Sequence, residues 1–378
     1  MIPVMPELFK SVLPNSTTAD VSVWAGALAS IFALMQFLFG PLLGTLSDRV
    51  GRKPVILISL IVMVGYYLIM AVAQSVWLLL IGRIVGGITA ATHATASAYI
   101  ADISTSEEKA ARFGLVGAAF GMGFVLGPVL GGLLGEFGPR APFYAAAALA
   151  ALNALSCTIW LHESVTNDIR QSFDWRRANP FGAFQALAKL GGLRDMFIVF
   201  LLYSIGTAIY AAIWPFFTEV RFDWSPGMIG ISLTIYGVCF AIVQGALVKP
   251  FIARFGERRT LIYGLVIEVV SLWLISIMTN GIILLIMIPF AALGVIAQPP
   301  LQAWMSRAAG DKNQGALQGV ISSLNALAMM MTPITMTSIF YAFSKNGSAF
   351  YFPGMPFFIS GILVLIALLV FFRIPSQK

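Results

Sequence analysis

The sequence repeats itself at an offset of 205 residues, and this repeat is the strongest constraint on its fold. Gly40 falls on Gly245, and Pro128 falls on Pro333. Between them, the charged segment GTLSDRVGRKP at residues 44–54 falls on a second charged segment at 249–259. Such clusters cannot lie in hydrocarbon, so each is expected to join two membrane spans in water. One offset that holds over about 90 residues indicates a duplicated membrane domain, which is typical of transporters rather than of enzymes.

The composition indicates a helical membrane protein. Hydrophobic residues make up 59% of the 378 residues and charged residues only 10%, which is too little charge for a soluble domain of this length. The apolar residues form continuous runs, unlike the alternating pattern of a membrane β-barrel. The net charge of +7 does not point to nucleic acid, because membrane topology accounts for the basic residues. Cys157 and Cys239 lie within apolar runs, which favours inert core thiols over a disulfide or a metal site.

Eleven apolar runs are long enough to cross a bilayer, which takes about 20 residues. The expected spans are residues 21–43, 55–73, 77–100, 113–135, 142–161, 196–217, 227–248, 260–278, 281–304, 316–340 and 355–373. Residues 1–13 are apolar but too short to span. Because the repeat aligns them with the span at 196–217, we expect them to be the end of a first helix whose beginning is missing.

The predicted fold is an all-α polytopic membrane protein of two pseudo-symmetric six-helix halves. The halves are residues 1–161, with a partial first helix, and residues 196–378. A polar linker at 162–195 joins them. Within it, Asn179 and Pro180 are typical of a helix start and Gly191 of a helix end, so the linker carries either an amphipathic surface helix or a plain connection.

Lysine and arginine residues predict the orientation in the membrane. Of the 23, eighteen lie in the connections that include residues 44–54, 162–195, 249–259 and the C-terminal tail. Four lie on the other side, and Arg83 lies within a span. Connections rich in these residues stay on the cytoplasmic side, so the charged segments and the C-terminus are expected in the cytoplasm.

Three motifs resemble those of the major facilitator superfamily, in the order and spacing of that family. GTLSDRVGRKP at 44–54 is similar to its signature loop between the second and third helices. GRIVGG at 82–87 resembles its fourth-helix arginine motif, and GMGFVLGPVLGG at 121–132 the fifth-helix motif of its proton-driven antiporters. The stretches RIVGGITAATHATASAYIADIS and ARFGERRTLIYG are most similar to bacterial tetracycline/proton antiporters and related drug exporters.

The resemblance implies two six-helix halves around a central cavity, and export of a drug-like small molecule in exchange for protons by alternating access. It implies a multi-pass monomer in the bacterial inner membrane, with substrate, protons and lipid as partners and no resident cofactor. A tetracycline substrate would travel as a divalent-cation chelate. Tyr66 and Phe240 stand where the tetracycline exporters have an acid and a histidine, and this departure argues against tetracycline itself.

Glu268 is the one acid in the middle of a predicted span. A carboxylate at this depth costs roughly 2.5–3.5 kcal/mol on insertion scales, and acids in such places are usually functional. The position also matches the ninth-helix acid of the tetracycline exporters. We therefore predict that Glu268 couples transport to protons or binds substrate. The alternative is an uncharged, hydrogen-bonded group that ties two helices together.

Arg83 and His93 are the mid-span basic candidates. A face of small residues follows Arg83, and such a face would let the arginine point into a cavity. The resemblance implies that it helps proton transfer, whereas the structural alternative is a side chain that reaches the nearer interface. An unperturbed histidine side chain has a pKa near physiological pH, so His93 is a candidate proton carrier, although a hydrogen-bonded packing histidine explains it as well.

Neutral polar and aromatic residues within spans are candidates for lining the cavity, and packing explains the same residues. They are Gln36, Tyr66, Asn153, Trp214, Phe240, Gln244, Gln298 and Asn325. The glycine and proline residues of the antiporter motif are expected to bend a helix and allow close packing between the halves. They are Gly123, Gly127, Pro128, Gly131 and Gly132.

The gating motif is expected to form one ion-pair clamp in each half. The repeat places Arg52 on Glu257 and Asp102 on Arg307, so both members of the family's arginine–acid pair change sign together. Asp48 has no acidic counterpart, and the family implies that it faces the start of the span near residue 316 in the other half. The other motif positions are Gly44, Arg49, Gly51 and Lys53. The alternative is that these charges only fix topology.

Two other functions remain open at this point. One is a proton symporter or a uniporter for a metabolite, with the same fold. The other is an intramembrane enzyme or a receptor. An enzyme needs paired acids, a metal set or a nucleophile with its base at membrane depth, and one acid with one histidine does not supply these.

Overall fold

The computed structural model describes residues 1–90, 92–105, 108–165, 179–182, 190–310, 313–345, 347–348 and 350–374, without the side chains of residues 93, 109–111, 120 and 191. These parts of the chain are helical and contain no strand. Eleven helical segments within them are long and apolar enough to cross a membrane, so the prediction of eleven full spans is confirmed.

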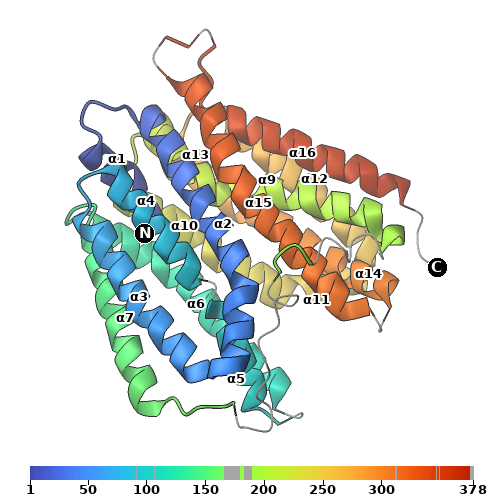
Figure 1. The fold of residues 1–378 in the computed structure, drawn as a ribbon. Helices are drawn as coiled ribbons and strands as arrows, with labels where there is room; N and C mark the ends of the chain where they lie inside the picture. Colours follow the sequence, from blue (N-terminus) through green and yellow to red (C-terminus); the bar gives the residue numbers. More distant parts are fainter. Residues whose placement is uncertain are drawn as a thin grey trace.

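The N-terminal half holds five spans and a short N-terminal segment, drawn from blue to green in Figure 1. Its elements are η1 Ile2–Val4, α1 Met5–Val12, α2 Thr18–Val50, α3 Arg52–Val72, α4 Val76–Ala90, α5 Thr92–Asp102, α6 Lys109–Gly135 and α7 Ala141–Trp160. The helices α4 and α5 form one span. The segment expected to be the end of a first helix is η1 and α1, which pack on α2, α6 and α9.

The C-terminal half holds six spans, two of which change helix type midway. Its elements are η2 Gly191–Leu193, α9 Arg194–Phe222, α10 Pro226–Ile242, η3 Val243–Leu247, α11 Val248–Phe255, α12 Glu257–Ile277, α13 Gly281–Ala292, η4 Leu293–Ala297, α14 Gln298–Ala309, α15 Gln314–Ser344 and α16 Met355–Arg373. The segment η3 is a π-helix and η4 is a 3₁₀-helix. Such irregular turns within spans are often found at functional sites.

The charged segment 44–54 is not the loop that the sequence predicts. The helix α2 continues to Val50, and Gly51 is the one residue that separates it from α3. Gly51 has φ of 120°, a conformation that side chains disfavour, and its N–H donates to Ser47 O at 3.1 Å. The repeat is preserved, because Gly256 has φ of 76° and separates α11 from α12 in the same way. These helices extend past the apolar region, so their last turns carry the charges.

The two halves meet along two helix pairs, α2 with α15 and α6 with α10 (Figure 1). The helices α2 and α15 touch closely at Gly26, where a Cβ would collide with Thr337 and lie 2.7 Å from Pro333 O. One turn on, Ile334 N donates to Ser30 Oγ at 3.2 Å. Small residues allow such close approach between spans.

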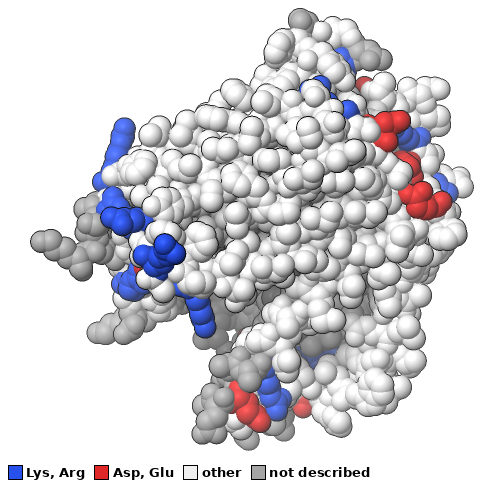
Figure 2. All heavy atoms as spheres, turned by 180° about the vertical axis from the view of Figure 1, so that it is seen from behind, with Lys and Arg blue, Asp and Glu red and all other residues white. Residues whose placement is uncertain are grey.

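On the face of the molecule in Figure 2, the charged side chains gather at two ends and leave a wide uncharged area between them. We call the end that carries Gly51 and Gly256 the motif face. We call the other end, which carries Lys10, Glu136 and Glu219, the opposite face. The uncharged area is where hydrocarbon would surround the helices.

The expected surface helix of the linker lies largely outside the described residues. The sequence predicts a helix start at Asn179 and Pro180 and a helix end at Gly191. Asn179 acts as expected of an N-cap, because its Oδ1 accepts a hydrogen bond from Phe181 N at 2.9 Å. Gly191 begins η2, which leads directly into α9.

Candidate functional site

A cavity of about 530 Å³ lies between the motif-side halves of α2 and α15. Volumes of this size are typical of sites for drug-sized ligands. Its lining is uncharged and mixes amides, hydroxyls and apolar groups. It includes Gln36, Phe37, Ser322, Ser323, Asn325 and Met329. Asn325 Oδ1 accepts a hydrogen bond from Ser204 Oγ at 3.2 Å, which orients the amide.

The structure separates the eight predicted cavity residues into different environments. Gln36 and Asn325 line the cavity between the halves. Asn153 lines a second cavity of about 550 Å³ that lies inside the N-terminal half, among α3, α5, α6 and α7. Gln244 and Gln298 are half-buried in η3 and at the start of α14, and they line none of the described cavities of this size.

The three aromatic candidates pack against neighbouring side chains and do not line the cavity between the halves. Tyr66 is buried against Gly86 and Tyr67, with the two tyrosine ring centroids 4.8 Å apart. Trp214 is buried and its indole Nε1 donates to Ser232 Oγ at 2.9 Å. Phe240 lies against Phe124 of the other half, at 6.1 Å between centroids. Because apolar rings fill gaps between spans as readily as they line cavities, hydropathy did not distinguish the two.

Glu268 is buried in the C-terminal half, with 1% of its surface exposed. It lies on α12 against η4, so closely that a Cβ on Gly294 would collide with the carboxylate. A Cβ on Gly264, one turn earlier, would lie 2.6 Å from Ala297 N of the same segment. Among the described residues no lysine or arginine pairs with Glu268. An unpaired charge at this position would be costly, so the carboxyl is suited to hold a proton.

Tyr210 is the polar neighbour of Glu268, and sequence analysis missed it. The Tyr210 hydroxyl faces the carboxyl. Neither Tyr210 Oη nor Glu268 Oε1 has a hydrogen-bond partner of good geometry in the described part of the chain. The Tyr210 ring stacks on Tyr236 of α10 at 5.5 Å between centroids. A tyrosine in an apolar run gives no signal in hydropathy, so only the three-dimensional arrangement of the helices could reveal it.

Arg83 does not point into the cavity between the halves. Its Nη2 lies 3.6 Å from Met5 Sδ, and its guanidinium lies over the Phe32 ring, 5.8 Å from the centroid. Arg83 Nε is buried without a partner among the described residues. The face of small residues does not border the cavity, because α3 packs on Gly86 through Tyr66 and α2 packs on Gly87 through Phe32. The side chain of His93 lies outside the described residues.

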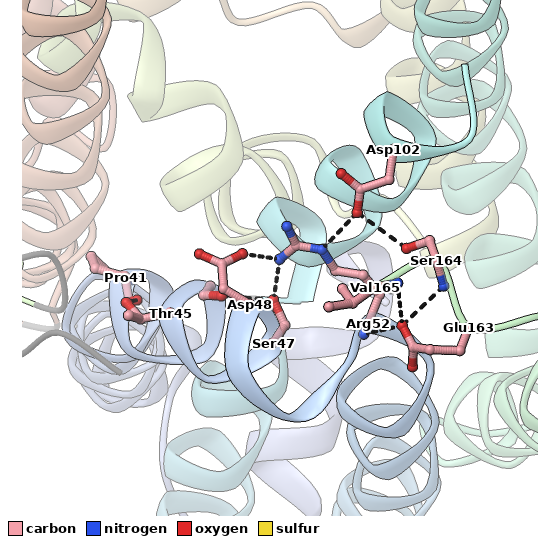
Figure 3. Close-up of polar contacts among 10 residues, drawn as sticks. Pro41, Thr45, Ser47, Asp48, Arg52, Asp102, Glu163, Ser164 and Val165 are labelled. Atoms are coloured by element: carbon pink, nitrogen blue, oxygen red, sulfur yellow. Dashed lines mark hydrogen bonds and ion pairs between the residues drawn. The ribbon is translucent and has the colours of Figure 1, made fainter. Parts of the chain in front are cut away.

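The gating motif forms a network around Arg52 (Figure 3). Arg52 Nε donates to Asp102 Oδ2 at 3.1 Å, and Nη1 lies 2.5 Å from both Asp48 Oδ1 and Ser47 Oγ. Only 11% of the Arg52 side chain is exposed. Arg49 is exposed at the end of α2, and Gly44 has open space around it. The structure therefore brings the predicted arginine–acid pair together and adds Asp48 to it.

Glu163 extends this network and was not predicted. Its carboxylate accepts hydrogen bonds from the backbone N–H of Arg52 at 2.8 Å and of Lys53 at 3.2 Å, the free donors at the start of α3 (Figure 3). The neighbouring Ser164 Oγ donates to Asp102 Oδ2 at 3.1 Å. Because the partners of Glu163 are backbone amides, no pattern of side chains in the sequence indicates the contact.

The C-terminal half has the simpler version of the same arrangement. Glu257 and Arg307 form an ion pair with two hydrogen bonds, one of them 2.9 Å between Nη1 and Oε1. Half of the Arg307 side chain is exposed. A second correspondence links the halves: Lys53 Nζ donates to Thr158 O at 3.1 Å, and Arg258 Nη2 donates to Ile374 O at 3.0 Å. Each base thereby ties its helix to the last helix of its own half.

The opposite face holds the halves together with charged contacts. Lys10 of α1 pairs with Glu219 of α9, which also accepts from Thr18 Oγ1 at 3.0 Å. Glu136, just after α6, accepts from Ser225 Oγ at 3.0 Å and from Gly227 N at 2.8 Å. Both acids therefore bind groups of the other half. The two halves are therefore in contact at the opposite face, and the cavity between them lies toward the motif face.

The antiporter motif lies partly at this closed contact. A Cβ on Gly132 would lie 2.9 Å from Pro226 O and 3.0 Å from Gly230 Cα, so this position allows α6 to approach α10. Pro128 O lies beside Gly230 as well. Gly131 borders Met1, whereas Gly123 and Gly127 have no neighbour that a Cβ would meet within 4 Å. Among the glycine and proline residues of the motif, the close contact with α10 is thus made at Pro128 and Gly132.

Replacing Glu163 with alanine is expected to destabilise the motif face modestly. The change leaves two N–H groups at the start of α3 without their acceptor, and the loss of such a cap costs about 1 kcal/mol. We expect an apparent Tm a few degrees lower in detergent, measured by the fluorescence of a thiol-independent dye. Glu108→Ala is the matched control, because Glu108 pairs with Arg112 on one helix. Equal Tm values for the two variants would contradict the capping role.

Comparison with known proteins places these features in a family. The family model described as Major Facilitator Superfamily matches residues 1–220 and, a second time, residues 196–378. A class C tetracycline resistance protein of Escherichia coli is 38% identical over 368 residues, which cover 97% of this chain and 91% of that protein. Multidrug resistance protein 2 of Bacillus subtilis is 28% identical and covers 88% of this chain and 82% of its own length.

Solved structures show the same fold at low sequence identity. The nucleoside transporter NupG superposes with a TM-score of 0.76 at 14% identity, over 99% of this chain and 98% of its own. The human organic anion transporter MFSD10 gives a TM-score of 0.69 at 22% identity, over 98% of this chain and 94% of its own.

Proposed function

This chain belongs to the major facilitator superfamily, and we propose that it exports an amphipathic drug-like molecule across the bacterial inner membrane in exchange for protons. The observation that carries the proposal is Glu268, a carboxyl that is buried in the middle of a span without a basic partner among the described residues. Such a group can alternate between a bound and a released proton. The similarity to tetracycline and multidrug resistance proteins supports a drug as the substrate.

The cavity between the halves is the substrate site in this proposal. Its lining supplies the Gln36 and Asn325 amides, two serine hydroxyls and the Phe37 ring, without a charged side chain. Such a lining suits a zwitterionic or neutral amphipathic molecule that is held by hydrogen bonds and ring contacts. If the substrate is a tetracycline, its divalent cation is carried as part of the cargo.

In this proposal, the change between the inward-open and outward-open states depends on η4 and on whether Glu268 carries a proton. Because η4 packs directly on the carboxyl at Gly294, a change in the charge of Glu268 disturbs that contact. The motif face is cytoplasmic in this proposal, as the lysine and arginine distribution predicts. The structure then corresponds to a state that takes up drug from the cytoplasm.

The test is proton-driven uptake into inverted membrane vesicles. A panel of tetracyclines, quinolones and cationic dyes is offered with and without an imposed proton gradient, with vesicles lacking the protein as the baseline. The proposal predicts accumulation of at least one compound only when the vesicle interior is acidic, together with proton release from the vesicles. Uptake that needs the reverse gradient would identify a symporter instead.

The opposite face is expected to close more firmly as the pH there falls. Burial raises the pKa of Glu7, and the nearby Glu219 and Glu136 raise it further, while Lys10 acts in the other direction. Opening this face would relieve the burial and return the pKa toward its ordinary value. Protonated Glu7 therefore stabilises the closed face, and this stabilisation is lost as pH rises through the raised pKa.

The measurement is alkylation of a cysteine at position 4 in a background without Cys157 and Cys239, because Val4 is fully buried at this face. Rates are normalised to a cysteine at exposed position 77, which removes the pH dependence of the thiol itself. Acidification is expected to slow the normalised reaction, and Glu7→Gln to flatten this dependence. An identical pH profile in the variant would contradict the role of Glu7.

A further inference from the structure

Glu136 docks on the start of a helix in the other half. Its Oε1 accepts from Gly227 N at 2.8 Å and from Ser225 Oγ at 3.0 Å. Ser225 is the N-cap residue of α10, a helix of 17 residues. The first N–H groups of a helix lack partners within it, and its N-terminus carries a partial positive charge that favours a carboxylate. Hydrogen bonds to a charged acceptor are about twice as strong as neutral ones.

The backbone around this contact fits the carboxylate closely. A Cβ on Gly227 would lie 2.5 Å from Glu136 Oε1, so glycine is what leaves room for the acid. A Cβ on Gly135 would lie 3.0 Å from Pro226 Cβ. The docked acid thus stands within the close contact between α6 and α10, where any separation of the halves at this face must break its bonds.

The motif face carries an acid in the matching position. Asp48 lies in the last turn of α2 in the N-terminal half, and Glu136 directly follows the last turn of α6. In the C-terminal half, α15 begins at Gln314 as α10 begins at Pro226. In this structure Asp48 Oδ1 lies 2.5 Å from Arg52 Nη1, within its own half. Of the two acids, the one at the closed face therefore contacts the other half, whereas the bonds that Asp48 makes to described residues lie within its own half.

We infer that Glu136 is a positioning residue that holds the opposite face closed and alternates with Asp48. When the opposite face opens, Glu136 leaves the start of α10. Closure of the motif face then brings Asp48 to the start of α15, which is the contact that the resemblance to the family implies. Each acid stabilises the state in which its own face is closed. This inference rests on the proposed function, because it requires that the two faces open in turn.

The test is the distance between spin labels across the opposite face. Labels at positions 77 and 282 lie on exposed side chains of α4 and α13, one in each half, and replace Trp77 and Ile282 in a background without Cys157 and Cys239. Double electron–electron resonance on the full chain in lipid nanodiscs gives the populations of short and long distances. Glu136→Ala is expected to raise the ratio of long to short distances by about tenfold, on the scale of two lost charge-assisted hydrogen bonds.

Graded and compensating variants make the test specific. Glu136→Gln keeps an acceptor without the charge and should shift the ratio by about threefold. Gly227→Ala, which crowds the acid from the partner side, should shift it in the same direction. Asp48→Asn should shift it the other way, and combination with Glu136→Ala should return it toward the wild-type ratio, because distant sites add. Glu108→Gln is the control that should change nothing.

Several outcomes separate this inference from the proposed function. Unchanged distances in Glu136→Ala, with correct folding by size exclusion, would overturn the inference even if drug and proton exchange are found. A shift in Glu136→Ala that Asp48→Asn does not reverse would overturn the alternation of the two acids. The distances need no drug and no proton gradient, so the expected shifts would support the inference even if the exported substrate proves not to be a drug.

Discussion

Replacing Glu268 with glutamine is expected to reduce proton-driven drug accumulation to the level of vesicles without the protein. Glutamine has nearly the same shape, so the packing of η4 on α12 should survive. It cannot bind and release a proton, so the link between the proton and the movement of η4 is lost. Because the carboxyl is buried with no basic partner among the described residues, none of the described ion pairs is broken by the change.

The decisive control separates coupling from folding. Glu268→Gln should still exchange drug across the membrane when drug is present on both sides, since the cavity at Gln36 and Asn325 lies elsewhere. Glu108→Gln, a change of the same chemistry at a half-exposed ion pair, should accumulate drug normally. Uphill accumulation by Glu268→Gln at the wild-type level would show that the coupling group is elsewhere.

Exchanging the charges of the two clamps is expected to give opposite results in the two halves. Glu257→Arg places two arginines face to face and should lower transport. Adding Arg307→Glu should restore it to within about twofold, because this exposed pair acts alone and is worth about 0–1 kcal/mol. The matching exchange, Arg52→Asp with Asp102→Arg, should keep the rate of transport more than about tenfold below that of the wild type.

The physical reason is the number of partners that each pair serves. Arg52 also binds Asp48 and Ser47, and Asp102 accepts from Ser164, so an acid at position 52 would face Asp48 at short range. In a network in which one side chain serves several partners, replacing one member breaks several interactions at once. Initial rates of uptake in vesicles, corrected for the amount of inserted protein, provide the measurement. Equal recovery of both exchanged pairs would show that the network around Arg52 has no role beyond its charge pair.

The fold followed from the sequence because lipid leaves few alternatives. Long apolar runs must form helices in a bilayer, so the eleven spans could be predicted. The predicted first and last residues of several spans differ from those in the structure. The bounds moved because α2 and α11 continue as helices into the charged segments, to Val50 and Phe255, where hydropathy falls but hydrogen bonding does not. The repeat was informative for the same reason, since Arg52 and Glu257 occupy equivalent turns.

The site followed less well, because its decisive contacts are between distant helices or with the backbone. Gln36 and Asn325 could be selected only as members of a longer list, and Trp214 and Arg83 from the same set of candidates lie outside the cavity between the halves. Glu136 bonds to a backbone amide and a serine of α10, so neither its neighbours in sequence nor its repeat position indicates the contact. Only Glu268 was evident from its position alone, as an acid within an apolar run.

The single-residue joints at Gly51 and Gly256 limit how the molecule can move. A connection of one residue is too short to extend, so α2 cannot slide along α3 without disrupting the turn. The same holds for α11 and α12. The ties from Lys53 to Thr158 and from Arg258 to Ile374 then attach each pair to the last helix of its half. These contacts make each half rigid at the motif face. A displacement of one helix therefore moves its whole half, as is required when two halves rock against each other as rigid bodies.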